Sequence, residues 1–199
     1  TNRIGILVNG LSLHNLNSQT TFENEGNWTY NTGFRQKTNR SNGLIANTNN
    51  EGVVTTTIPT SEMSNTTVWG NSTTHSGIVG WAFDGLPIYG PYGYTDRLDN
   101  TSAIKRLESG YSLKTTIRTT VGGTPTGEFV EDFEYDSTTG DLDEFNTRYG
   151  VTPEFPLGTR YYVTTLNSNL QPAYPFTVGP KYFFTPASLS TNATGTATH

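Results

Sequence analysis

The apolar residues of this chain fall into short stretches where they alternate with polar residues, and turn-forming residues separate the stretches. Over residues 111–118, Tyr111, Leu113 and Ile117 alternate with Ser, Lys, Thr and Arg, which predicts a half-buried strand. Evenly spaced aromatic residues over 129–135, with acidic residues between them, predict a second strand. Further strand candidates are Val53–Ile58, Tyr161–Leu166 and Tyr174–Val178. The pattern therefore favours a mainly β protein.

Two dipeptides, Asp84-Gly85 and Asn9-Gly10, stand between apolar runs and favour tight turns. Asp, Asn and Gly tolerate the positive φ angles of a type I′ turn, so each dipeptide predicts a β-hairpin with a two-residue turn. The runs that they join are Ile78–Phe83 with Leu86–Tyr89, and Ile4–Val8 with Leu11–Leu13.

The stretch Gly80–Asp96 (GWAFDGLPIYGPYGYTD) is dense in aromatic, glycine and proline residues. Its glycines and prolines force tight bends, which predicts a rigid aromatic corner after the hairpin. Flat aromatic rings can form a sugar-stacking surface, and the candidates are Trp81, Tyr89, Tyr92 and Tyr94. The alternative is that these rings pack in a core corner, because aromatic side chains contribute large packing energies.

A single mainly β domain over residues 1–186 is the expected organisation, sandwich-like, with long loops and one or two short helices. Residues 14–50 predict a long polar loop with one or two weak strands, and Ala103–Ser109 predicts a short helix that Gly110 ends. Residues 187–199 are rich in Ser, Thr, Ala and Gly, which predicts a linker or flexible tail. Because the chain starts with Thr, we expect it to be a segment of a longer protein.

Composition and charge limit the classes of partner and site that this chain is expected to have. The net charge is −5, the pI is near 5.1 and no basic run occurs, so nucleic acid is not an expected partner. The chain has no cysteine, which excludes disulfides and thiolate metal sites. No stretch approaches the roughly 18 apolar residues that suggest a transmembrane helix, so no membrane span is expected.

Four regions, in a fixed order, resemble the motifs of one known family. The central one is His75–Tyr94 (HSGIVGWAFDGLPIYGPYGY), preceded by Ile4–Leu13 (IGILVNGLSL). The later ones are Gly140–Arg148 (GDLDEFNTR) and the closing segments Thr152–Tyr162 (TPEFPLGTRYY) and Pro172–Phe176 (PAYPF). Together they resemble the YHYH-domain proteins over most of residues 3–184.

This copy lacks the Tyr-His-Tyr-His stretch from which that family takes its name. Its histidines are His14, His75 and His199, and the corresponding region, residues 51–74, contains none. If the family's histidines bind a metal or transfer protons, the resemblance implies that this chain has lost that activity. Domains of this type resemble modules of secreted bacterial proteins and of virion proteins from marine phages.

The segment 136–144 (DSTTGDLDE) is an acidic, glycine-containing loop of a kind that can bind Ca²⁺ through several oxygens. Its candidate ligands are Asp136, Asp141, Asp143 and Glu144, although the spacing is not that of an EF-hand. The structural alternative is local capping, in which Asp141 caps a short turn and Glu144 reaches back. An ion pair from Asp143 or Glu144 to Arg148 is expected with it.

The sequence gives only weak evidence for a catalytic site. His75 stands beside the central motif, and Asp84 is its nearest candidate partner for proton transfer by sequence. The alternative is that His75, as a single histidine without partners, has a structural role as a hydrogen-bonding residue. No Gly-x-Ser-x-Gly or His-Glu-x-x-His motif occurs, so no enzyme activity and no cofactor other than Ca²⁺ are expected.

These observations favour a non-enzymatic structural or interaction module of an extracellular assembly, in particular a phage virion appendage or decoration protein. Its expected partners are other structural chains in an oligomeric assembly, with surface glycans as a further candidate. The alternative is a secreted carbohydrate- or metal-binding domain, based on the aromatic corner and the acidic loop. Either function implies an extracellular or virion location.

Overall fold

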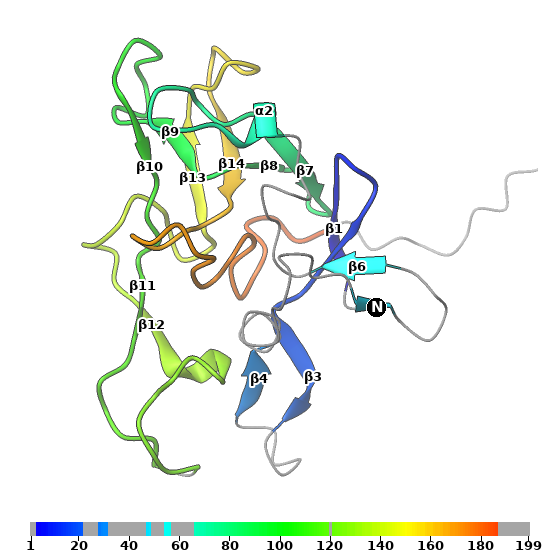
Figure 1. The fold of residues 1–199 in the computed structure, drawn as a ribbon, viewed down its shortest axis with the longest axis vertical. Helices are drawn as coiled ribbons and strands as arrows, with labels where there is room; N and C mark the ends of the chain where they lie inside the picture. The colour runs from blue at the N-terminus through cyan, green and yellow to red at the C-terminus, as the bar shows by residue number, and fades with distance from the viewer. Residues whose placement is uncertain are drawn as a thin grey trace, which may run out of the picture.

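The structure is a computed structural model that describes residues 3–21, 28–31, 47–48, 54–56, 66–119 and 121–186. It is mainly β, with several sheets and almost no helix, which confirms the predicted fold class (Figure 1). Its described helical segments are the short helix α2 (Thr66–Trp69) and the 3₁₀ turn η2 (Val130–Asp132). The predicted tail, residues 187–199, lies outside the described residues.

The largest element is an eight-stranded mixed sheet in the order β13-β14-β8-β7-β1-β2-β6-β5. Two of its pairings, β14 with β8 and β2 with β6, are parallel, and the others are antiparallel. The strands are β1 (Arg3–Leu7), β2 (Ser12–His14), β5 (Asn47–Thr48), β6 (Val54–Thr56), β7 (Ile78–Ala82), β8 (Pro87–Tyr89), β13 (Thr147–Gly150) and β14 (Thr159–Val163).

Both predicted hairpins are present, as β1–β2 and β7–β8, but their turns are longer than the sequence indicated. Ala82 donates its N–H to the carbonyl of Leu86, and Leu7 donates to Leu11, so each turn holds three residues. Only the third has a positive φ, at Gly85 (89°) and Gly10 (86°). A two-residue type I′ turn needs two positive angles, and Asp84 does not supply one.

Three two-stranded sheets complete the described fold. Their strands are β3 (Asn17–Thr21) with β4 (Thr29–Asn31), β9 (Tyr92–Tyr94) with β10 (Ile104–Arg106), and β11 (Tyr111–Leu113) with β12 (Phe133–Tyr135). The helix predicted over Ala103–Ser109 is wrong. Ile104, Lys105 and Arg106 pair instead with Tyr94, Gly93 and Tyr92, a long-range pairing that the local capping pattern did not show.

Several predicted strands are shorter in the structure or absent, and the one over 129–135 is a strand only at Phe133–Tyr135. The half-buried strand over 111–118 ends at Leu113, and Ile117 is 65% exposed. Residues 174–178 form no strand, because Pro175 has no N–H and Phe176 has a φ of 72°. The Phe176 N–H donates to Ala173 and the Thr177 N–H to Pro175, so the segment is a compact turn.

The main sheet contributes to the core on both faces. Ile88 and Tyr162 are register partners and belong to one buried cluster, with Leu13, Val79 and Leu86. Neighbouring strand residues point to opposite faces, so Tyr89, Tyr161 and Val163 belong to a second buried cluster with Leu107 and Leu142. Burial on both faces gives the fold its sandwich-like character. A third cluster, around Leu16, Tyr174 and Phe176, lies beside β11 and β12.

Candidate functional site

The aromatic corner does not form one platform. Tyr89 is fully buried, and its hydroxyl contacts Thr152 Oγ1 at 2.9 Å and donates to Glu154 Oε2 at 2.8 Å. Tyr92 and Tyr94 are half-buried in β9, whereas Trp81 is 41% exposed on β7. Of the four predicted ligand-binding residues, the structure therefore exposes Trp81 and uses Tyr89 for packing and hydrogen bonding.

His75 lies beside this corner and is 8% exposed. Its ring contacts Tyr94, with centroids 4.6 Å apart, and Tyr89, with centroids 5.7 Å apart. Nδ1 lies 2.5 Å from the Ser76 carbonyl oxygen and donates to it, which leaves Nε2 as a buried acceptor without a hydrogen-bond partner. Burial lowers the pKa of His75 below its usual 6.5, against the opposing effects of the Ser76 carbonyl and Glu154.

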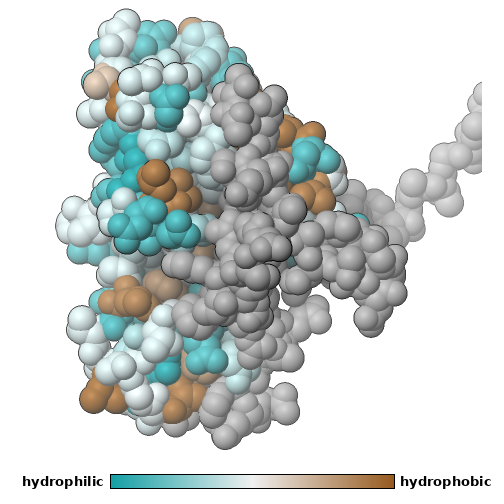
Figure 2. Space-filling model, viewed as in Figure 1, coloured by the Kyte–Doolittle hydropathy of each residue, from teal (hydrophilic) through white to brown (hydrophobic). Residues whose placement is uncertain are grey.

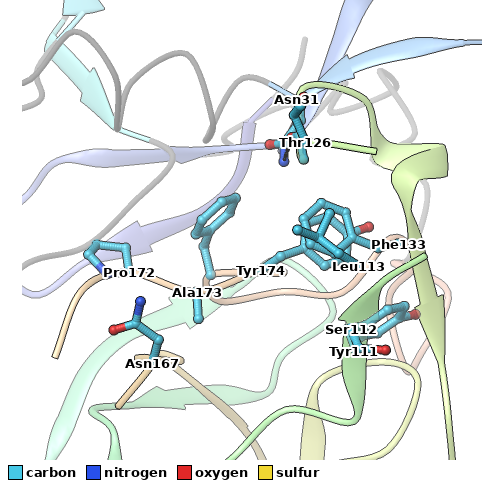
Figure 3. A pocket seen from close by; sticks show the side chains of 12 residues that line it. Asn31, Tyr111, Ser112, Leu113, Thr126, Phe133, Asn167, Pro172, Ala173 and Tyr174 are labelled. Atoms are coloured by element: carbon cyan, nitrogen blue, oxygen red, sulfur yellow. Dashed lines mark hydrogen bonds between the residues drawn. The ribbon is translucent and has the colours of Figure 1, made fainter. Parts of the chain in front are cut away.

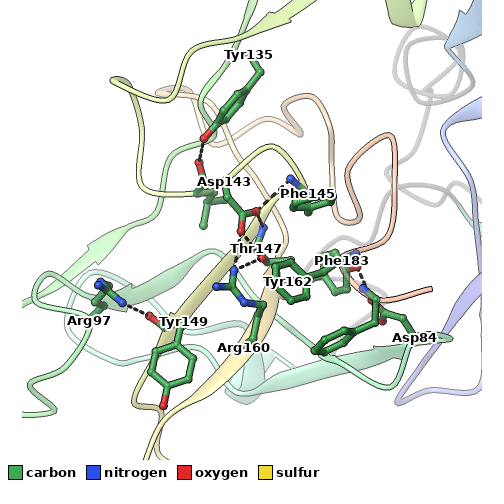
Figure 4. Close-up of polar contacts among 12 residues, drawn as sticks. Asp84, Arg97, Tyr135, Asp143, Phe145, Thr147, Tyr149, Arg160, Tyr162 and Phe183 are labelled. Atoms are coloured by element: carbon green, nitrogen blue, oxygen red, sulfur yellow. Dashed lines mark hydrogen bonds and ion pairs between the residues drawn. The ribbon is translucent and has the colours of Figure 1, made fainter. Parts of the chain in front are cut away.

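Asp84 makes no hydrogen bond to His75 and instead binds Tyr162 and the backbone of Phe184. Tyr162 donates its hydroxyl hydrogen to Asp84 Oδ2 at 2.7 Å, and the Phe184 N–H donates to the same oxygen at 3.3 Å (Figure 4). The Tyr162 hydroxyl also accepts the Phe183 N–H at 2.8 Å. Asp84 thus fastens residues 183–184 to the β7–β8 turn, and the proposed proton-transfer pair with His75 is not assembled.

The predicted acidic ligands are held in separate local networks. Asp136 Oδ1 accepts the N–H and hydroxyl of Thr138, and Asp141 pairs with Lys105 Nζ at 2.6 Å. Glu144 uses its backbone carbonyl to accept the Tyr111 hydroxyl. Among the described residues, no group of three or more His, Cys, Asp or Glu side chains is placed to hold a metal ion.

Asp143, rather than Asp141, stabilises the turn that follows it (Figure 4). Its Oδ1 accepts the Phe145 N–H at 3.1 Å and the Thr147 N–H at 2.8 Å. Its ion-pair partner is Arg160, at 2.6 Å, so the predicted pair with Arg148 is wrong. Side chains of β13 alternate between the two faces of the sheet, and that of Arg148 is buried. It donates to the Thr95 carbonyl at 3.3 Å.

An exposed apolar strip runs along β1 and β7, made of Ile6, Val8, Trp81, Phe83 and Phe184. Ile6 and Trp81 face each other across the two strands and are 48% and 41% exposed. Val8 and Phe83 stand in the turns at opposite ends of this strand pair and are 55% and 51% exposed. The Phe184 N–H donates to Asp84, the residue after Phe83, so Phe184 lies at the β7–β8 turn, and it is 51% exposed.

Sequence patterns found Trp81 but missed the rest of this strip. Ile4–Val8 is a nearly continuous apolar run, which does not indicate which side chains face solvent. The register of β1 on β7 decides that question. The face of the molecule in Figure 2 carries its hydrophobic residues in separate groups among hydrophilic ones.

The fold is that of a mainly β domain, in which His75 and Asp84 have separate hydrogen-bond partners. Comparison with protein families matches residues 1–175 to the family described as YHYH protein. The chain therefore belongs to the YHYH family, as its motifs predicted. Searches of curated proteins and of solved structures found no match.

Among the described residues there is also no helix with the length and apolar character to cross a lipid bilayer.

Proposed function

We propose that this domain is a non-enzymatic interaction module of an extracellular assembly, and that the apolar strip is its contact surface. The observation that carries the proposal is the exposed cross-strand pair of Ile6 and Trp81 with Phe83 beside it. Single exposed apolar residues are ordinary on protein surfaces, but a contiguous group is typical of an interaction site.

The strip has the properties of an interface anchor. Aromatic side chains are enriched where interfaces contribute most of their binding energy. Trp81 stands on a strand that is hydrogen-bonded to β1 on one side and to β8 on the other, so little backbone freedom would be lost on binding. Asp84 and Tyr162 hold Phe184 at the edge of the same surface.

Two arguments support a non-enzymatic role. His75 and Asp84, which the sequence offered as an acid–base pair, have separate partners. Three carboxylates of the acidic loop have structural partners: Thr138 for Asp136, Lys105 for Asp141 and Arg160 for Asp143. The domain is proposed to act by contact with other chains.

A phage virion appendage or decoration protein is the setting that we propose for this module. Its support is membership of the YHYH family, whose domains resemble virion and secreted modules, together with a composition rich in Thr, Asn and Gly. Quantitative mass spectrometry of purified particles, culture supernatant and cytoplasm tests this setting. Enrichment in particles is expected, and recovery only from the cytoplasm would contradict it.

A secreted carbohydrate- or metal-binding domain was the alternative function. Its two original sites lose support, because Tyr89 is buried and the acidic loop does not gather its carboxylates. The apolar strip favours a protein partner over either ligand.

A further inference from the structure

A pocket of about 470 Å³ lies away from the apolar strip, between the β11–β12 hairpin and the segment 167–176 (Figure 3). Its walls include Tyr111, Phe133, Tyr174 and Phe176, and its polar lining includes Ser112 and Asn167. The volume is within the roughly 300–1,000 Å³ range of small-molecule sites. None of the residues predicted from sequence as ligand-binding lines it.

Phe133 supplies an apolar ring surface. The rings of Phe133 and Tyr174 stack with centroids 3.8 Å apart and planes 4° apart, so Tyr174 covers one face of Phe133. Tyr174 is almost fully buried, whereas Phe133 is half-buried and lines the pocket. Both rings line the pocket, and the stacking holds the Phe133 ring in a fixed orientation there.

Asn167 supplies a hydrogen-bond donor. Its Oδ1 accepts the N–H groups of Asn169 and Gln171 at 3.0 and 2.9 Å, which fixes the orientation of the amide. The opposite atom, Nδ2, points toward Pro172 and Ala173 in Figure 3 and has no hydrogen bond within the described part of the chain. Ser112, on β11 and apart from Asn167 in Figure 3, adds a hydroxyl group to the lining.

The frame of the pocket is held in place before any ligand binds. Asp132, at the end of η2, is fully buried and pairs with Arg118 at 2.7 Å. The same carboxylate accepts the N–H groups of Gly127 and Phe129. The Tyr111 hydroxyl donates to the Glu144 carbonyl at 2.8 Å, which fixes the other wall. A preformed site loses less entropy when it binds.

We propose that this pocket binds a neutral saccharide ring. None of the described residues that line it has a charged side chain, so these residues offer no counter-charge to an ionic ligand. A sugar ring has an apolar C–H face, which suits the Phe133 ring, and a hydroxyl edge, which suits the Asn167 amide and Ser112. The proposal does not depend on the apolar strip, because the two share no residue.

An NMR titration of the whole chain tests saccharide binding through the chemical shifts of its backbone amides. The probes are glucose, galactose, N-acetylglucosamine and their neutral disaccharides. We expect saturable shifts at Ser112, Leu113, Phe133 and Ala173 with at least one sugar. Phenol, a ring without a sugar's hydroxyl edge, is the comparison probe. Saturable shifts with phenol but with none of the sugars would overturn the saccharide class, and no shifts at these amides with any probe would overturn the site.

Two variants locate the binding. Leu113 is 43% exposed, so Leu113→Asp places a charge on the wall without emptying the core, and we expect affinity to fall at least about tenfold. Asn167→Asp keeps the acceptor that closes the turn but removes the amide donor, so affinity should fall while the thermal midpoint is kept. Leu157→Asp, at a 94% exposed position outside the pocket, is the control. Unchanged affinity in both pocket variants would contradict the assignment.

Discussion

At the scale of single residues, the buried ion pair of Arg118 and Asp132 constrains the loop around it. Burial of the Asp132 carboxyl acts to raise its pKa, but hydrogen bonds from Arg118 and from the N–H groups of Phe129 and Gly127 outweigh it and keep the pKa below its ordinary value. A charge held in this way is costly to leave without its partners. This carboxylate is a structural organiser of the loop that it contacts.

The substitution Asp132→Asn should lower the free energy of unfolding by about 3–5 kcal/mol, because it leaves the Arg118 guanidinium buried without a counter-charge. Chemical denaturation at pH 7 measures this loss. The control is Asp136→Asn, since Asp136 is exposed and bonds only within its own turn. Equal losses in the two variants would contradict the role given to Asp132.

The histidines make the stability of the folded state depend on pH. Because burial lowers the pKa of folded His75, with Arg148 acting in the same direction, the unfolded chain binds a proton first as the pH falls through 6.5. Stability present above pH 6.5 should therefore be lost below it. His14 has a pKa lowered by burial, Arg3 and the N-terminus, and adds to the same slope.

Unfolding free energies of the wild type and of His75→Gln between pH 7.5 and about 5 test this contribution. The variant should show a shallower loss on acidification, and adding His14→Gln should make the loss shallower still. Parallel curves for wild type and His75→Gln would show that His75 does not titrate differently in the two states.

At the scale of elements, local signals predicted the parts of the fold that local chemistry determines. The turn dipeptides identified β1–β2 and β7–β8, because their residues lie close in sequence. The pairing of β14 with β8, and of Tyr92–Tyr94 with Ile104–Arg106, depends on register between segments that no dipeptide encodes. The saccharide pocket was missed for the same reason, since Ser112, Phe133 and Asn167 come from separate segments.

The glycines of these hairpins have two distinct roles that substitution can separate. Gly85 and Gly10 have positive φ angles and open space around a Cβ atom, so Gly85→Ala and Gly10→Ala should each cost about 1–2 kcal/mol from backbone strain. At Gly80 a Cβ would lie 2.7 Å from the Ile6 carbonyl oxygen, so Gly80→Ala should cost more, by moving β7 from β1. Chemical denaturation of the three variants measures this, and an equal cost would contradict the close approach of the strands.

The acidic loop yields a prediction about Ca²⁺. A ligand that binds only the folded state raises the unfolding midpoint by mass action. Asp136, Asp141 and Asp143 have separate partners, so excess Ca²⁺ should leave the thermal midpoint where Mg²⁺ at the same ionic strength leaves it. A rise specific to Ca²⁺ that Asp143→Ala abolishes would restore the metal-binding interpretation.

At the scale of the whole molecule, long-range pairing joins the ends of the described chain. The hydroxyl of Tyr182 donates to the Ile4 carbonyl at 3.0 Å, and Asp84 holds Phe184 beside the β7–β8 turn. The second of these contacts also places Phe184 at the β7–β8 turn, next to the exposed pair of Ile6 and Trp81. Stability and the proposed interaction surface are built by one set of residues.

The most direct test of the interaction module is the incorporation of variants into the assembly that contains it. Trp81→Gln removes the centre of the strip, and Leu98→Gln changes a 59% exposed leucine in the segment between β9 and β10. Leu98→Gln should keep its stability within about 0.5 kcal/mol, as is usual for surface sites, and Trp81→Gln should stay folded while losing its cross-strand contact with Ile6, worth about 0.2–1 kcal/mol. Quantitative mass spectrometry of purified particles should then find Trp81→Gln depleted and Leu98→Gln present at the wild-type level. Equal incorporation of the two variants would contradict the central claim.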